Sequence, residues 1–231
     1  MPRSARFVVP GLPHHITQRG TARQTVFSTR ADRRVCLGLL REQARLAELP
    51  ILAYCLMRNH IHLIVVPRDG AQLAEVMQRV HGRYAQYRNG RLSRCGHLWQ
   101  NRYSSCALGP AHLWLALRYV EQNPVRAALV QRAEEWEWSS ARAHLAGQDR
   151  QRLLDMEFWR REGGVENWRR LLKVPSDTEF QRSLRRATYA GQPFGDEQFT
   201  EMVRSLRKPP ASAAAAAEQI QSGMQLAAPA Y

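Results

Sequence analysis

Apolar residues follow two different periodicities along the first 125 residues of the chain. Short stretches that are continuously apolar, or alternate with polar residues, predict strands, and longer stretches with apolar residues three or four apart predict helices. In chain order the predicted elements are a strand over 14–19, a helix over 29–49, strands over 51–57 and 60–66, a helix over 70–88, a strand within 98–108 and a helix over 110–122. This order predicts an α+β domain of ferredoxin-like type, in which helices pack on an antiparallel sheet.

Local signals mark several of these boundaries. Thr29 precedes Asp32 by three residues, the spacing of a capping box at a helix start. Pro50 ends the same helix, because proline lacks the amide hydrogen that a helix interior needs. The pair Asn123-Pro124 ends the last predicted helix, since the residue before a proline avoids helical backbone angles.

The composition changes beyond residue 148. The region after it is predicted to be a helical, basic C-terminal extension that ends in two short helices, over 177–188 and 196–207, joined by a Gly/Pro turn. Such a pair occurs both in DNA-contacting modules and in ordinary helical hairpins, so both interpretations stay open. The last residues lack apolar periodicity and predict a disordered tail. The predicted organisation is a first domain over 1–148, the extension over 149–208 and the tail over 209–231.

The net charge of the chain indicates what kind of partner the protein binds. The chain has 34 lysine and arginine residues against 20 aspartate and glutamate residues, a formal net charge of +14 in 231 residues. Lysine occurs only at Lys173 and Lys208, and arginine pairs with phosphate and stacks on bases through its planar guanidinium. The excess predicts a polyanionic partner, either nucleic acid or an anionic membrane surface. A generally arginine-rich composition is the alternative.

Other features exclude whole classes of protein. With 44% hydrophobic residues the chain can form a core, so it is not disordered throughout. No run approaches the ~20 consecutive apolar residues of a membrane span, and the apolar patch over 7–10 is too short for a signal peptide. The cysteines include no CxxC pair, which argues against a disulfide framework or a zinc ribbon. We therefore expect a cytoplasmic protein that does not insert into a membrane.

The acidic residues avoid two regions of the chain. The first of them is Asp32, and none lies between Glu75 and Glu121. In the second region aromatic residues interleave with arginines, a combination typical of surfaces that bind single-stranded nucleic acid. Tyr84 and Trp114 are expected in the core instead, because each falls on an apolar helical stripe. The arginines predicted to contact DNA are Arg19, Arg23, Arg79, Arg83, Arg88, Arg91, Arg94, Arg102 and Arg118.

The run His60-Ile61-His62 carries the sharpest local chemistry. On a strand, residues two apart face the same way, so both imidazoles project together while Ile61, Leu63 and Val65 fill the opposite, buried face. Two imidazoles placed in this way can converge on one divalent metal ion. Histidines on a strand also serve ordinary hydrogen bonding, and the pair alone does not decide between the two.

Tyr119 and Asn123 form a second candidate pair. They are four residues apart, at the end of a predicted helix, and so face the same way. The apolar stripe of that helix uses Leu113, Leu117 and Val120, which leaves Tyr119 off the packing face. A tyrosine with a carboxamide one turn away is arranged like a nucleophile beside a possible metal ligand, although a lone tyrosine there is ordinarily a surface residue.

Five segments occur in the order and spacing of a known family. They are 14–20 (HHITQRG), 57–63 (MRNHIHL), 96–102 (GHLWQNR), 119–127 (YVEQNPVRA) and 138–140 (WSS). Over residues 7 to 145 the chain resembles the REP-associated tyrosine transposases. These are HUH-type single-tyrosine DNA nucleases related to the transposases of small bacterial insertion sequences. Arg58, His14 and Gln192 depart from the residues usual in that family at their positions.

The resemblance implies that residues 1–148 form an HUH-type catalytic domain that cleaves and transfers single-stranded DNA near hairpin-forming repeats. It implies Tyr119 as the nucleophile, which forms a 5′-phosphotyrosine intermediate. His60 and His62 match the paired metal ligands, and Asn123 falls where a further polar ligand is expected. The implied cofactor is a divalent metal, Mg²⁺ or Mn²⁺, and the implied partner is single-stranded or hairpin DNA. Whether the protein acts as a monomer or a homodimer is left open.

Three alternatives remain at the level of sequence. The first is a non-catalytic protein that binds and regulates hairpin DNA on the same scaffold. The second is a metal hydrolase that uses water in place of tyrosine, although no carboxylate base is evident near His60. The third is a zinc site formed by Cys95, His97 and Cys106, which the missing CxxC spacing disfavours.

Overall fold

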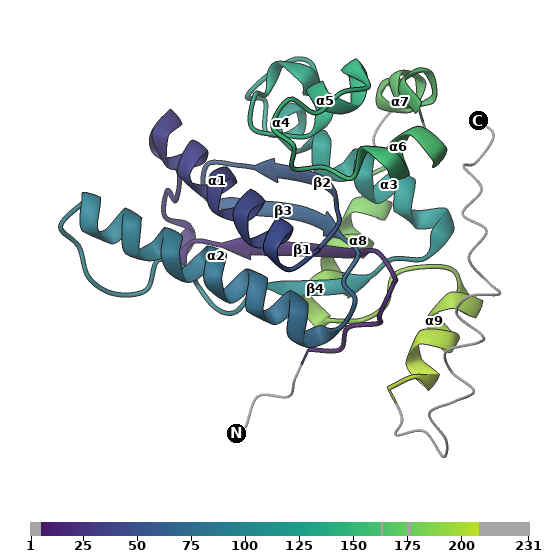
Figure 1. Cartoon of the computed structure of the whole chain (residues 1–231). Coiled ribbons are helices and arrows are strands. Elements are labelled where there is room, and N and C mark those ends of the chain that lie inside the picture. Colours follow the sequence, from purple (N-terminus) through teal and green to yellow (C-terminus); the bar gives the residue numbers. More distant parts are fainter. Residues whose placement is uncertain (1–5, 163, 175–176, 208–231) are drawn as a thin grey trace.

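The predicted sheet is present, with the strand order of a ferredoxin-like domain. The computed structural model describes residues 6–162, 164–174 and 177–207. The strands are β1 (His14–Arg19), β2 (Ile51–Leu56), β3 (His60–Val65) and β4 (Ser104–Ala107). They form one sheet in the order β2-β3-β1-β4, and each neighbouring pair is antiparallel (Figure 1). The α+β class predicted from the alternation of the two periodicities is therefore confirmed.

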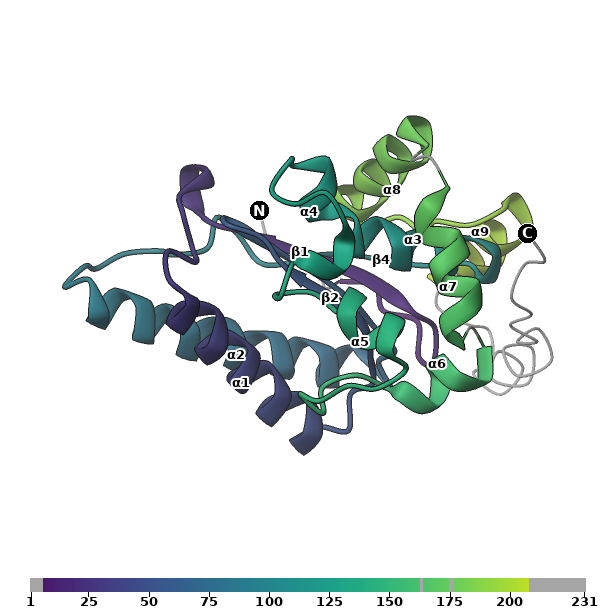
Figure 2. The same ribbon diagram turned by 90° about the horizontal axis from the view of Figure 1, so that it is seen from above.

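Helices cover both faces of this sheet (Figure 2). One face is covered by α1 (Arg30–Leu46) and α2 (Gly70–Arg91), and the other by α3 (Pro110–Glu121) and α8 (Thr178–Ala190). Shorter elements complete the described chain: α4 (Asn123–Arg126), α5 (Ala141–Ala146), α6 (Met156–Glu162), α7 (Gly164–Lys173), α9 (Glu197–Ser205) and the 3₁₀ turns Thr21–Arg23 and Ala133–Glu135.

The alternation along β3 divides its side chains between two hydrophobic cores. Ile61, Leu63 and Val65 belong to the core under α1 and α2. Ile64 belongs to the second core, with residues of α3 and α8. Since side chains two apart share a face, His60 and His62 lie on the α3 and α8 side of the sheet. The predicted separation of the histidines from the apolar face is confirmed.

Element boundaries differ from prediction where tertiary contacts decide them. The capping box of α1 is present: the Asp32 amide donates to Thr29 Oγ1 at 3.1 Å, and Asp32 Oδ2 accepts from the Thr29 amide at 2.8 Å. The fourth strand is shorter than predicted, because its pairing with β1 stops at Thr17 and Ser104 and resumes only as an isolated antiparallel bridge between Gly20 and Trp99. Gln100 donates to the Arg19 carbonyl oxygen, and Leu98 accepts from the Thr21 amide, both at 2.9 Å.

The aromatic residues of the acid-free region pack inside the protein. Tyr84, Tyr103 and Trp114 are 7% exposed or less, and Tyr87 and Trp99 pack against the core under α1 and α2. Tyr84, Tyr103 and Trp114 are therefore core residues and not a platform on which bases stack, and for Tyr103 this corrects the interpretation of the sequence. The core positions predicted for Tyr84 and Trp114 are confirmed.

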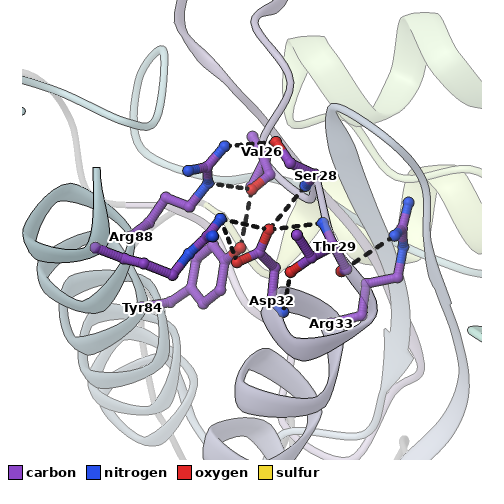
Figure 3. A network of polar contacts seen from close by, with 8 residues as sticks. Val26, Ser28, Thr29, Asp32, Arg33, Tyr84 and Arg88 are labelled. Atoms are coloured by element: carbon purple, nitrogen blue, oxygen red, sulfur yellow. Dashed lines mark hydrogen bonds and ion pairs between the residues drawn. The ribbon is translucent and has the colours of Figure 1, made fainter.

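Arg88 crosses from α2 to the loop before α1 (Figure 3). Its side chain is buried; Nε donates to the Val26 carbonyl oxygen at 3.0 Å, and Nη2 donates to Ser28 Oγ at 2.6 Å. Nearby, Arg91 pairs at 3.0 Å with the carboxylate of Asp32, whose side chain is fully buried. These guanidinium groups tie the two helices together from within the structure.

The C-terminal extension shares its core with the first domain. Trp114 of α3 stacks near Phe158 and Trp159, and Trp168 of α7 donates from Nε1 to Glu121 Oε2 at 2.8 Å. The predicted boundary at residue 148 therefore does not separate two hydrophobic cores. Within the described ranges, no helix is long and apolar enough to cross a membrane. The predicted tail over 209–231 lies outside the described residues.

Candidate active site

A cavity of about 350 Å³ opens on the face of the sheet that α3 and α8 cover. Strand register places its floor: His60 pairs with Arg19 of β1, and His62 pairs with Thr17. Because directly paired residues of antiparallel strands point to the same face, all four side chains reach the cavity. Its lining contains three arginines and no aspartate or glutamate. The site therefore favours an anionic ligand.

The two histidines present one free nitrogen each. His60 Nδ1 donates to Asn59 Oδ1 at 2.7 Å, and His62 Nδ1 lies 2.9 Å from His15 Nε2. The centroids of the His60 and His62 rings are 4.9 Å apart. Neither Nε2 has a hydrogen-bond partner among the described residues. Burial lowers the pKa of His60 to about 4 and the pKa of His62 well below its ordinary value, so both rings are neutral near pH 7.

Asn123 adds a carboxamide oxygen to the same cavity. It begins α4 directly after α3, and its Nδ2 donates to the Tyr119 carbonyl oxygen at 3.0 Å. That bond fixes the orientation of the amide and leaves Oδ1 as the group that can accept a ligand. Neutral imidazoles together with a carboxamide oxygen fit a divalent cation that keeps open positions for substrate.

No richer metal site is available in the described part of the chain. No group of three or more histidine, cysteine, aspartate or glutamate side chains lies close enough there to hold a metal ion. Cys95 is exposed, whereas Cys106 is buried in β4 with its sulfur 3.3 Å from Thr188 Oγ1. The alternative zinc site from Cys95, His97 and Cys106 is therefore wrong.

Tyr119 lies in the last turn of α3 and reaches the cavity although it is only 5% exposed. The edge of its ring meets His62, with ring centroids 5.5 Å apart and an interplanar angle of 87°. The expectation that it stands off the packing face needs correction, since α3 is covered on a second side by the extension. Burial raises the pKa of Tyr119, and the positive charges of Arg126 and Arg185 oppose that shift.

Several cavity residues are not predicted by any pattern in the sequence. Gln181, Arg185 and Tyr189 come from α8, which the chain order gives no reason to place beside β4 and β1. His15 and Arg126, in contrast, lie within segments that carried the family resemblance. The alternation of β1 could have found His15, because it is two residues before Thr17 and so shares the face of the cavity.

The predicted DNA-binding arginines separate into three groups. Arg19 lines the cavity. Beyond it, Arg23 is exposed at the end of the 3₁₀ turn Thr21–Arg23, and Arg94 and Arg102 are exposed on loops. Three others on or near α2 are paired with acids: Arg79 with Glu75, Arg83 with Glu42 and Arg91 with Asp32. Two are buried within the fold, namely Arg88 and Arg118, the latter donating to the Val174 carbonyl oxygen. We withdraw these two from the candidate contacts.

The described residues thus form a ferredoxin-like sheet that carries a histidine pair beside a tyrosine. The family model described as "Transposase IS200 like" matches residues 8–123, and the chain belongs to that family of transposases. The family predicted from the five sequence segments is confirmed at this level. No curated protein matches the chain by sequence.

Two solved structures resemble the fold to different degrees. One is the REP-associated tyrosine transposase bound to a REP hairpin, with 17% identity and a TM-score of 0.53. That match covers 63% of this chain and 86% of the other. The second is a protein assigned to the transposases from Deinococcus radiodurans R1, with 18% identity over 53% of this chain and 97% of the other. Its TM-score of 0.36 is too low to indicate a shared fold.

Proposed function

We propose that this transposase cleaves and transfers single-stranded DNA at hairpin-forming repeats, with Tyr119 as the nucleophile. The observation that carries the proposal is the meeting of Tyr119 with the histidine pair in one acid-free cavity, where its ring lies 5.5 Å from the ring of His62. Since the cavity lining has no carboxylate, a phosphate can approach the tyrosine without like-charge repulsion.

His60, His62 and Asn123 are the residues that would hold the divalent metal, Mg²⁺ or Mn²⁺. A cation bound there would draw negative charge from a non-bridging phosphate oxygen, which makes the phosphorus easier to attack. The chain itself presents the ligands in the right state. The imidazoles are neutral because they are buried, and the Asn123 amide is held by the Tyr119 carbonyl oxygen.

Tyr119 would supply the covalent step. Its Oη forms a bond to phosphorus, the bond from phosphorus to the 3′ oxygen breaks, and the phenol proton is lost as the 3′ oxygen takes up a proton. The 5′-phosphotyrosine that results keeps the energy of the phosphodiester, so strand transfer needs no ATP. Arg126 and Arg185 favour the phenolate form that attacks, because their positive charges oppose the effect of burial on the pKa of Tyr119.

The exposed arginines would guide the DNA to this step. Arg19 and Arg185 line the cavity, and Arg23 and Arg94 extend the positive surface along neighbouring loops. A hairpin as the recognised feature is supported by the solved REP-associated transposase, which is bound to a REP hairpin. A single-stranded target is favoured because the reacting phosphodiester must enter a confined cavity of about 350 Å³.

A covalent-adduct assay tests the proposal. An oligonucleotide with a hairpin and a single-stranded flank, labelled at its 3′ end, is incubated with the protein and Mn²⁺ or Mg²⁺. We expect the wild type to retain label on the protein and Tyr119→Phe to bind the DNA without retaining label. Tyr87→Phe removes the same hydroxyl from a tyrosine away from the cavity and is expected to behave like the wild type. If the wild type binds the DNA but forms no adduct, the regulatory alternative is favoured.

A further inference from the structure

A chain of hydrogen bonds joins His62 to the C-terminal extension. His62 Nδ1 lies 2.9 Å from His15 Nε2, and His15 Nδ1 lies 2.8 Å from Thr188 Oγ1. Thr188 is in α8, and its Oγ1 donates to the Leu184 carbonyl oxygen at 2.7 Å. Each of His15, His62 and Thr188 is buried. The protons in such a buried series of hydrogen bonds have few arrangements that satisfy every group.

The Leu184 carbonyl oxygen, at the end of this series of hydrogen bonds, sets the donor and the acceptor in each bond. Thr188 Oγ1 donates its single hydroxyl proton to the Leu184 carbonyl oxygen, which can only accept. The hydroxyl oxygen keeps two acceptor positions. Its two other neighbours are His15 Nδ1 at 2.8 Å and the sulfur of Cys106 at 3.3 Å, and both must therefore donate to it. His15 carries its proton on Nδ1.

The position of the proton on His15 in turn determines the position of the proton on His62. A neutral His15 that is protonated on Nδ1 has a lone pair on Nε2, so it accepts from His62 Nδ1. His62 then has its own lone pair on Nε2, the nitrogen without a hydrogen-bond partner among the described residues. We propose that Thr188, acting through His15, is a positioning residue that fixes His62 as the Nδ1–H tautomer and keeps its Nε2 lone pair available. The use of that lone pair for a metal ion rests on the proposed function.

His60 is held by an independent chain of the same kind. Asn59 Nδ2 donates to the Arg23 carbonyl oxygen at 3.1 Å, which turns Asn59 Oδ1 toward His60. Asn59 Oδ1 then accepts from His60 Nδ1 at 2.7 Å, so His60 also has its lone pair on Nε2. The two chains share no residue. His60 is therefore an internal reference for any change made at Thr188.

The hydrogen bonds that run from Leu184 through Thr188 and His15 to His62 form a relay. This relay links the C-terminal extension to the active site. Helix α8 packs on β4 and β1, and Thr188 reaches the face of the sheet that carries the histidines. Without the Thr188 oxygen, the Nδ1–H of His15 has no acceptor. The population of the other His15 tautomer, with the proton on Nε2, then increases. That tautomer donates from Nε2 to His62 Nδ1 and forces the His62 proton onto Nε2, where it blocks the lone pair.

Nitrogen-15 NMR of the full chain reads these tautomers directly. Histidine-labelled protein is freed of metal with a chelator, and long-range proton–nitrogen correlations are recorded near neutral pH. We expect both His60 and His62 of the wild type to be protonated on Nδ1. In Thr188→Val we expect His62 to shift toward Nε2–H while His60 is unchanged, and Thr188→Ser to restore the wild-type pattern. Cys106→Ala, which removes a neighbour of Thr188 outside the relay, is expected to leave both tautomers unchanged.

A titration with Mn²⁺ alone supplies the second readout. Loss of the relay is expected to weaken Mn²⁺ binding roughly tenfold or more in Thr188→Val, the size of effect that residues behind metal ligands have. Protonation of His62 on Nε2 in the wild type would overturn the relay, and so would a Thr188→Val protein with unchanged tautomers and affinity. The wild-type spectrum decides the first point even if the variant does not fold. Wild-type protein with the expected tautomers but no Mn²⁺ binding would refute the metal site of the proposed function and leave the relay standing.

Discussion

The guanidinium carbon of Arg126 lies 4.3 Å from the centre of the Tyr119 ring, and Arg126 Nη2 donates to the Tyr119 carbonyl oxygen at 2.9 Å. The same side chain thus holds the backbone of Tyr119 and places a positive charge over its ring. A cation in this position stabilises a phenolate relative to a phenol, in a cavity where burial alone does the opposite. Arg126 is therefore the residue we expect to matter most to the reactivity of Tyr119 after the metal ligands.

Arg126→Gln is expected to lower the rate of covalent-adduct formation on the order of 10²-fold, the size of effect that loss of one preorganised donor has at a developing charge. Binding of hairpin DNA should change little, because other arginines supply the remaining attraction. Arg126→Lys keeps the charge and should recover part of the rate. Single-turnover kinetics with saturating protein separates the two effects. Equal rates for Arg126→Gln and the wild type would remove Arg126 from the reaction.

The histidine pair gives a prediction about metal dependence. His60→Ala and His62→Ala each remove one of two imidazole ligands, so cleavage supported by Mn²⁺ or Mg²⁺ should be lost in both variants. His97→Ala is the matched control, since His97 is exposed on a loop and does not line the cavity. Chelation of the metal in the wild type should have the same effect as the two substitutions, and renewed addition of Mn²⁺ should reverse it. Nicking by His62→Ala at the wild-type rate would exclude the pair as ligands.

The sequence predicted the sheet and the direction of the histidines because both depend on local alternation. The α3 and α8 side of the site could not be predicted in the same way. Helix α3 is buried nearly all round, since the sheet covers one side and the extension another, so one apolar stripe did not describe it. The contacts of Thr188 with His15 and Cys106 join segments far apart in the chain, for which no periodicity gives a signal.

Arg88 was wrongly predicted to contact DNA, for a different reason. The helical periodicity of α2 already indicates that its side chain points inward. It follows Tyr84 by four residues and so continues the buried stripe of α2, which indicates an inward direction. Charge alone favoured the surface. The buried position is compatible with charge because Val26 and Ser28 provide oxygen acceptors there.

Substitution of Arg88 is accordingly predicted to affect stability. Arg88→Met keeps an apolar stem but removes both donors. The Val26 carbonyl oxygen then keeps only the Tyr84 hydroxyl as a side-chain donor, and Ser28 Oγ loses the donor from Arg88, which should cost about 1–3 kcal/mol in the free energy of unfolding. Arg79→Met changes an exposed ion pair with Glu75 and should cost less than about 1 kcal/mol. Urea unfolding followed by circular dichroism compares the two. Equal stability of Arg88→Met and the wild type would contradict the buried network.

The exposed loop that follows α2 leads to a prediction about DNA affinity. Arg94 is exposed and has no ion pair with any described residue, so Arg94→Ala should weaken DNA binding. If Arg94 neutralises one phosphate, its removal should reduce the slope of log K against log salt concentration by about 1. Arg83→Ala is the comparison, because Arg83 is engaged with Glu42 at 2.9 Å and should change the slope less. Fluorescence anisotropy over a series of salt concentrations gives both slopes. An unchanged slope for Arg94→Ala would remove that loop from the DNA-binding surface.

The central claim is that Tyr119 forms the covalent bond to DNA, and mass spectrometry identifies the bonded residue most directly. The wild-type protein is reacted with a hairpin oligonucleotide and Mn²⁺, digested with nuclease and protease, and the peptide that carries the remaining nucleotide is sequenced. Tyr119 competes with Tyr189, which lines the same cavity and is 57% exposed. We predict a nucleotide linked through phosphate to Tyr119 and an unmodified Tyr189. A nucleotide on Tyr189, or a covalent adduct that persists in Tyr119→Phe, would contradict the proposed mechanism.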